Sequence, residues 1–306
     1  MHLPYPIVVP TDFSAAAAHA YPLAQQMAAA FERPLRLVHV LNPLDAEVTW
    51  IPASAEAYLN DRLSELELEL SAGGLPVTST VRRGFAAREI LDEVADKTAM
   101  VVLGVSGRVG EKHRLFGSVS AKVLRGSPVA VLTVRAPETP EPHVRPIRRV
   151  LITLDFSELE TGAFDDAAEV ARRLGASVDL VHVLRPPELP LVRADFEGIP
   201  GVPPVSLAEL EQLAGRELER VADRARAMGI TLGSVVLREG DPVDTVIDHI
   251  HATDPDLVIM SSHGRRGFSR ALLGSVTEAV VMRSPRPVLV LKPRQTYLEV
   301  VRPSPL

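Results

Sequence analysis

Residues 7–14 read IVVPTDFS and residues 150–157 read VLITLDFS, so one short pattern occurs twice in the chain. The two occurrences are 143 positions apart, and a second shared phrase, VHVL, keeps that spacing at 38–41 and 181–184. Similarity at a fixed spacing is the signature of a repeated structural unit. The sequence therefore predicts two copies of one domain.

The length of the chain, 306 residues, also fits two domains of about 150 residues each. Later landmarks lie further apart, Gly84 and Gly240 by 156 positions and Gly117 and Gly274 by 157. The second copy therefore carries an insertion of about a dozen residues, which we place in the proline-rich stretch 185–204. The expected boundaries are 1–136 for the first domain, 137–147 for a proline-rich linker, 148–295 for the second domain and 296–306 for a C-terminal tail.

Short apolar runs bounded by breaking residues predict five buried strands in the first copy. Their ranges are 7–10, 35–41, 77–81, 100–103 and 129–134. Helical patterns lie between them, and in the second copy Ser157 with Glu160 forms a capping box ahead of a helix at 163–174. Alternating strands and helices predict an α/β fold, with two tandem open, mostly parallel five-stranded sheets and helices on both faces.

The composition excludes several classes of protein. Hydrophobic residues make up 46% and charged residues 24%, as in folded domains rather than disordered chains. The net charge of -6 disfavours binding to nucleic acid or to an anionic membrane. Disulfides and thiolate chemistry are excluded because there is no cysteine. We find no secretory signal and no apolar run of about 20 residues, and therefore expect a soluble, cytoplasmic protein.

Asp12 and Asp155 follow the first predicted strand of each copy and precede Ser14 and Ser157, the expected helix N-caps. In an open parallel sheet, ligands bind beyond the carboxyl ends of the strands, where the strand order reverses. A carboxylate there could accept hydrogen bonds from an adenine amino group or a ribose hydroxyl. Alternatively, each aspartate only completes the strand-to-helix turn. Its recurrence in both copies adds weight to the binding role.

A glycine pattern follows the fourth predicted strand. The first copy has Gly104, two residues, Gly107, nine residues, then Gly117 and Ser118, after which a helical pattern begins. The second copy has Ser261, Gly264, Gly274 and Ser275 at the same spacing. Glycines let a backbone approach a ligand closely, and the unpaired amides at a helix start suit a phosphate. The repeated constellation is hard to explain by turns alone.

These motifs resemble the universal stress protein family, whose ATP-binding members carry Gly-x-x-Gly, nine residues, Gly-Ser/Thr after the fourth strand and an aspartate after the first. The resemblance covers nearly all of both halves and includes the phrases VVPTDFS, LVHVL, SSHGRRG and LLGSV. It implies the adenine nucleotide α-hydrolase-like fold and ATP as ligand. It further implies that the two copies pair as an intrachain pseudo-dimer through their last strands, 129–134 and 288–291, with a homodimer as a further possibility.

The resemblance also assigns roles to single positions. The aspartates would border adenine and ribose together with a valine of the second strand, and the phosphates would lie against the glycine-rich loop and the helix start. The implied nucleotide-binding residues are Thr11, Asp12, Val40, Gly104, Gly107, Arg108, Gly117, Ser118 and Val119 in the first copy, and Asp155, Val183, Ser261, Gly264, Arg265, Gly274, Ser275 and Val276 in the second. The two arginines could reach the phosphates or lie in solvent. Because Ser261 departs from the glycine of the motif, we expect the first copy to hold the more dependable site.

The histidines of the chain are not expected to take part in catalysis or metal binding. His39 and His182, on the second strand of each copy, are interpreted as structural. His249 and His251 would point to different faces of a helix, so no protein-held metal site is expected there. Neither the Walker A motif nor the dinucleotide glycine motif occurs, and no catalytic base is evident.

We therefore expect an ATP-binding stress or signalling module that is not an enzyme beyond weak ATP hydrolysis, with Mg²⁺ bound only through the phosphates. One alternative is a slow ATPase or nucleotidyl-transfer enzyme of the adenine nucleotide α-hydrolase-like group. A second alternative is an interaction protein whose nucleotide sites are vestigial.

Overall fold

The computed structural model of the chain describes residues 5–41, 53–95, 98–105, 116–136, 145–157, 162–185, 207–262 and 273–292. The strands are β1 Ile7–Pro10, β2 Leu35–Leu41, β3 Val77–Arg83, β4 Met100–Val105 and β5 Ala130–Arg135 in the first copy, and β6 Arg149–Leu154, β7 Ser177–Leu184, β8 Leu232–Glu239, β9 Leu257–Ser261 and β10 Val288–Leu291 in the second. The helices are α1 Ala15–Phe31, α2 Ala53–Ser71, α3 Ala86–Val94, α4 Ser118–Gly126, α6 Ala163–Leu174, α8 Leu207–Ala227, α9 Pro242–Thr253 and α10 Ser275–Arg283.

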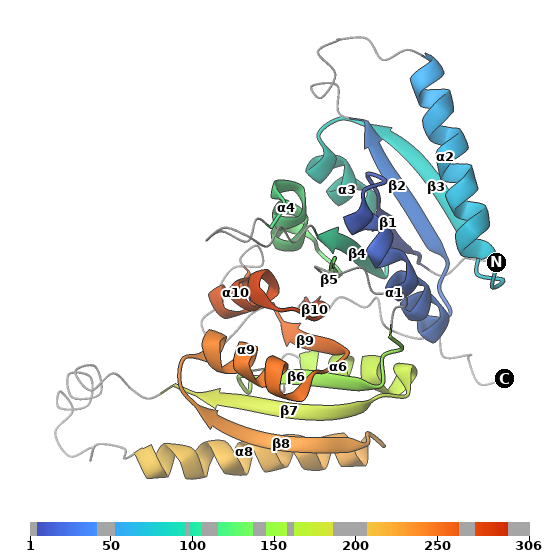
Figure 1. Ribbon diagram of the computed structural model, residues 1–306. Helices are drawn as coiled ribbons and strands as arrows, with labels where there is room; N and C mark the ends of the chain where they lie inside the picture. The colour runs from blue at the N-terminus through green and yellow to red at the C-terminus, as the bar shows by residue number, and fades with distance from the viewer. Residues whose placement is uncertain are drawn as a thin grey trace.

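The described residues form one ten-stranded sheet in the order β3-β2-β1-β4-β5-β10-β9-β6-β7-β8 (Figure 1). Neighbouring strands are parallel within each copy. At the middle of the sheet β5 and β10 pair antiparallel, with Leu132 opposite Leu289. The α/β fold of two tandem parallel units is confirmed, and so is the predicted pairing of the last strands. That pairing removes two sheet edges that would otherwise be exposed.

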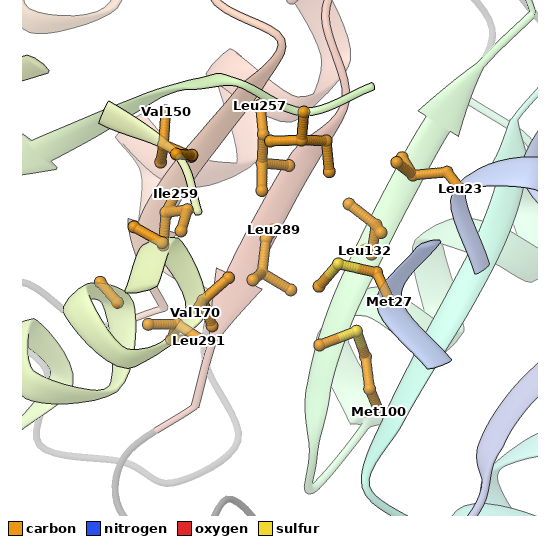
Figure 2. Close-up of a cluster of buried hydrophobic side chains, with 14 of the residues drawn as sticks. Leu23, Met27, Met100, Leu132, Val150, Val170, Leu257, Ile259, Leu289 and Leu291 are labelled. Atoms are coloured by element: carbon orange, nitrogen blue, oxygen red, sulfur yellow. The ribbon is translucent and has the colours of Figure 1, made fainter. Parts of the chain in front are cut away.

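Helices cover both faces of the sheet, as the apolar sequences of the central strands require. One face carries α1, α2, α6 and α8, and the opposite face carries α3, α4, α9 and α10. On the first face a single hydrophobic cluster runs through both copies. Figure 2 shows Met27 of α1 and Leu132 on one side of the junction, with Leu289 and Val170 of α6 on the other. The two copies therefore share one core.

On the other face of the sheet, two cationic side chains at matching positions of the two copies reach across the β5–β10 pairing to a helix of the other copy. Arg135, at the end of β5, donates to the carbonyls of Met282 at 2.7 Å and Ser284 at 3.2 Å, at the C-terminal end of α10. Lys292, which follows β10, donates to the Leu124 carbonyl of α4 at 2.8 Å. A positive charge is favourable at the C-terminal end of a helix. Burial lowers the pKa of the Lys292 amine to about 8.

The start of α6 differs from the prediction. Ser14 caps α1 as expected, its hydroxyl accepting a hydrogen bond from a main-chain amide in the first turn. The predicted capping by Ser157 is wrong, because α6 has Gly162 as its N-cap, with a φ of 77°. The Ser157 hydroxyl donates to Asp155 at 2.5 Å, while residues 158–161, which include Glu160, lie outside the described residues.

The predicted insertion and C-terminal tail fall almost entirely outside the described residues, and the domain boundaries stay predictions. Over the part of the chain that the structure covers, none of the helices combines the length and the apolar character that a membrane span requires.

Candidate nucleotide-binding sites

The order of the strands places the predicted site residues together. Strand order reverses between β1 and β4 in the first copy and between β6 and β9 in the second. Asp12 follows β1 and Gly104 lies near the end of β4, so both stand at the carboxyl edge beside one reversal. Asp155 after β6 and Ser261 at the end of β9 repeat this arrangement. Such a reversal is the usual ligand position in an open α/β sheet.

The two aspartates close the strand-to-helix turn. The Oδ1 atom of Asp12 accepts a hydrogen bond from the Ser14 amide at 2.9 Å, and Oδ1 of Asp155 accepts one from the Ser157 amide at 2.9 Å. Asp12 is exposed and Asp155 is half-buried. The turn role that was the alternative is thus present in both copies. It uses one carboxylate oxygen, and within the described residues the Oδ2 atom of Asp12 has no hydrogen-bond partner.

Thr11 supports this turn from inside the protein. Its hydroxyl lies 2.6 Å from the Tyr21 hydroxyl and accepts a hydrogen bond from the Phe13 amide at 3.0 Å. Burial raises the pKa of the Tyr21 phenol, so the phenol stays protonated and can donate to Thr11. The second copy has Leu154 and Phe164, both buried, at the same two positions. A contact between Thr11 and a nucleotide stays a prediction, because its side chain is already engaged.

Gly104 has a structural reason that the sequence did not reveal. A Cβ on Gly104 would lie 2.1 Å from the carbonyl oxygen of Ala16 in the first turn of α1. The predicted reason, room for a nucleotide, is therefore not needed to explain this glycine. In the second copy Ser261 occupies the position, and its carbonyl accepts a hydrogen bond from the Thr277 hydroxyl at 2.8 Å.

Gly117 and Gly274 are the N-cap residues of α4 and α10, and no side chain caps either helix. Their φ angles of -54° and -59° are open to any residue. A Cβ on Gly117 would come no nearer than 3.8 Å to another described atom, and one on Gly274 no nearer than 3.5 Å. Neither backbone conformation nor packing within the described residues explains these glycines.

The helix starts beyond these glycines are suited to an anion. The first intrahelical bonds run from the Ala121 amide to Gly117 and from the Glu278 amide to Gly274, both at 2.9 Å. The amides between each glycine and that bond belong to the unpaired first turn, where the helix dipole is positive. Ser118, Val119 and Ser275 lie there and are exposed, and Val276 is half-buried.

The remaining predicted residues fall into two groups. Val40 of β2 and Val183 of β7 are half-buried on strands that neighbour β1 and β6. Gly107, Arg108, Gly264 and Arg265 lie outside the described residues. The structure therefore places each aspartate beside the end of the fourth strand of its copy. A site that joins the aspartate, the loop and the helix start stays a prediction.

His39 and His182 were interpreted as structural, and both donate to a main-chain carbonyl. His39 Nδ1 lies 2.8 Å from the Thr11 oxygen, and His182 Nδ1 lies 2.7 Å from the Leu154 oxygen. Each carbonyl belongs to the residue just before the aspartate. The repeated VHVL phrase was the sequence signal for this link, but its target could not be read from the sequence.

Comparison with known proteins agrees with this geometry. The family model described as the Universal stress protein family matches residues 5–135 and 146–292. A universal stress protein of Mycobacterium tuberculosis is 31% identical over 288 residues, which cover 85% of this chain and 87% of that protein. One of Mycolicibacterium smegmatis is 29% identical over 314 residues, covering 95% and 98%. The crystal structure of a universal stress protein from Archaeoglobus fulgidus matches with a TM-score of 0.66 at 22% identity, covering 94% of this chain and 98% of that one, a likeness of fold alone. Since the family model matches both copies, the chain belongs to the universal stress protein family.

Proposed function

We propose that the chain binds ATP at two sites, one at each reversal of strand order, and acts as a nucleotide-dependent stress or signalling module. The observation that carries the proposal is the pair Gly117 and Gly274. Each begins a helix and has an ordinary backbone conformation, and an added Cβ would meet the described atoms only at ordinary van der Waals distance. A phosphate approaching the helix start accounts for both glycines at once.

The aspartates supply the other end of the proposed site. Asp12 keeps one carboxylate oxygen outside the turn, and that oxygen can accept a hydrogen bond from the adenine amino group or a ribose hydroxyl. A guanine base would present a carbonyl oxygen where adenine presents its amino group, and two acceptors repel. Adenine selectivity is therefore part of the proposal. Mg²⁺ would be held through the phosphates, with its remaining ligands supplied by water.

Slow turnover follows from the same arrangement. Main-chain amides and a helix dipole hold a phosphate in place, but fast hydrolysis also needs a group that orients or deprotonates water. The residues assigned to the site provide none. The alternative, a slow ATPase or nucleotidyl-transfer enzyme, would become the better description at a turnover rate in the ordinary enzyme range of about 1 to 1000 per second.

Two measurements test the proposed function. Mass spectrometry of small molecules released from freshly purified, heat-denatured protein should find ATP or its hydrolysis product. Calorimetric titration of nucleotide-free protein should show binding of ATP and much weaker binding of GTP. Equal affinities for ATP and GTP would remove the adenine role of the aspartates. Binding of neither nucleotide would favour the interaction protein with vestigial sites.

A further inference from the structure

In both copies a histidine contacts the residues on either side of the aspartate: its ring nitrogen bonds to the carbonyl before the aspartate, and its ring lies beside the phenylalanine after it. In the first copy the His39 Nδ1 atom lies 2.8 Å from the Thr11 carbonyl oxygen, and the His39 and Phe13 rings have centroids 5.0 Å apart. Because a carbonyl can only accept, Nδ1 must carry the proton. The second copy repeats the bond at 2.7 Å between His182 and Leu154, and its His182 and Phe156 rings stack at 4.1 Å.

The residue between the carbonyl and the helix adopts a costly conformation. Phe13 has a φ of 60° and Phe156 a φ of 71°, a region that bulky residues rarely enter. Among the described residues, the other two non-glycine residues with positive φ, Glu32 and Asp254, are helix C-caps, where this conformation is common. The aspartate turns therefore need support from outside the turn, and each has a histidine on the neighbouring strand.

We propose that His39 and His182 are positioning residues for the nucleotide, acting through Asp12 and Asp155. The histidine N–H fixes the carbonyl before the aspartate, and its ring packs against the phenylalanine after it. In the first copy Asp12 is held between these two contacts, with Oδ1 on the turn amide and Oδ2 left for the ligand. This inference rests on the proposed function, because it assigns a role within the same site.

The copies differ in how much other support the turn receives. In the first copy the Thr11 hydroxyl also accepts a hydrogen bond from the Phe13 amide and is hydrogen-bonded to the Tyr21 hydroxyl. Leu154 has no side-chain oxygen with which to repeat this bond. In the second copy the Ser157 hydroxyl donates a hydrogen bond to Oδ1 of Asp155 at 2.5 Å.

A coupled set of variants tests the positioning role. Gly274→Val provides a background in which only the first site is intact. There, His39→Phe keeps an aromatic ring beside Phe13 and removes the donor. We expect it to weaken ATP binding about tenfold, the equivalent of one net hydrogen bond. His39→Asn, whose side-chain amide can donate to the same carbonyl, should recover most of the affinity.

The decisive measurement is whether the effect of His39→Phe on ATP affinity depends on the presence of Asp12. If His39 acts through Asp12, then His39→Phe should have little further effect on ATP affinity once Asp12→Ala is present. An equal loss with and without Asp12 would mean that His39 only stabilises the fold, and would overturn the proposal. Should His39→Phe fail to fold, as judged by its thermal unfolding, His39→Leu takes its place in the same cycle. The His182 and Asp155 pair is tested likewise in a Gly117→Val background.

ATP binding by the chain and the positioning role of His39 are contradicted by different results. If the unmodified chain binds no ATP, the proposed function and the positioning role fall together. If it binds ATP but the His39 and Asp12 effects are additive, only the positioning role is lost.

Discussion

Gly104 of β4 lies against the Ala16 carbonyl of α1, so closely that a Cβ on Gly104 would stand 2.1 Å from that oxygen. The first turn of α1 can rest on β4 only because position 104 has no side chain. In the second copy Ser261 stands at the matching position, and α6 begins at Ala163. Residues 158–161, which would match the first turn of α1, lie outside the described residues.

This relationship predicts unequal effects of exchanging the two residues. Gly104→Ser should lower the free energy of unfolding by about 1–3 kcal/mol, because the added atoms overlap main-chain atoms that cannot move aside. Ser261→Gly should change it by less than about 1 kcal/mol, the ordinary effect of a glycine in a strand. Urea unfolding of both variants beside the unmodified chain measures the difference. Equal losses at the two positions would contradict the packing explanation.

The parts of the fold that the sequence predicts are those with a repeated or periodic signal. The strands, the aspartate at the end of β1 and the glycine at the start of α4 each follow from local pattern. The pairing of β5 with β10 was predicted through the family resemblance and is confirmed, and the structure shows that it is antiparallel.

What the sequence could not predict is which partner the folded chain gives to a particular residue, whether that partner is near or far in the chain. Ser157 has the residue type of an N-cap, yet its hydroxyl bonds to Asp155 and α6 starts elsewhere. The reason for Gly104 is a contact with Ala16, far away in the chain. Thr11 and Tyr21 of the first copy are replaced by Leu154 and Phe164 in the second, and the sequence does not reveal that each two residues form a buried pair. Local pattern carries no information about such pairs.

That exchange predicts strong coupling between positions 11 and 21. Thr11→Leu alone leaves the buried Tyr21 hydroxyl without its partner and should destabilise the chain by about 1–3 kcal/mol. Adding Tyr21→Phe recreates the apolar pair of the second copy and should recover most of that loss. A double-mutant cycle of urea unfolding measures the coupling. Additive losses would show that the two side chains act independently.

The Lys292 amine predicts a pH-dependent penalty at the junction. Its pKa is lowered by burial from 10.5 to about 8, so the folded chain disfavours the charged form. Below pH 8 both folded and unfolded chains carry the proton and the penalty is complete. It shrinks as the pH rises from about 8 to 10.5, since the unfolded chain then binds more protons. At about 1.4 kcal/mol per unit of pKa, the penalty is at most about 3.5 kcal/mol.

Lys292→Met should therefore stabilise the chain at pH 7 and do so less, or not at all, at pH 10. The gain at pH 7 should be about 1–2 kcal/mol, because the Leu124 carbonyl loses its donor. Lys292→Arg, which imitates Arg135 of the other copy, keeps its charge at both pH values and serves as the control. The quantity to compare is the difference in free energy of unfolding between each variant and the unmodified chain. If the Lys292→Met difference is the same at pH 7 and pH 10, the amine does not titrate as described.

The last prediction concerns the two glycines on which the proposed function depends. At Gly117 the φ of -54° and ψ of 142° suit any residue, so Gly117→Val should block the phosphate while weakening the fold by only about 1 kcal/mol, the effect of a poorer N-cap. Gly274→Val should do the same in the second copy, where φ is -59° and ψ is 139°. Calorimetry of each folded variant should show one bound ATP fewer than the unmodified chain, and of the double variant none. We expect the first copy, which carries the complete glycine motif, to bind more tightly than the second, where Ser261 replaces Gly104. Unchanged binding in Gly117→Val, together with complete loss in Gly274→Val, would make the second copy the working site.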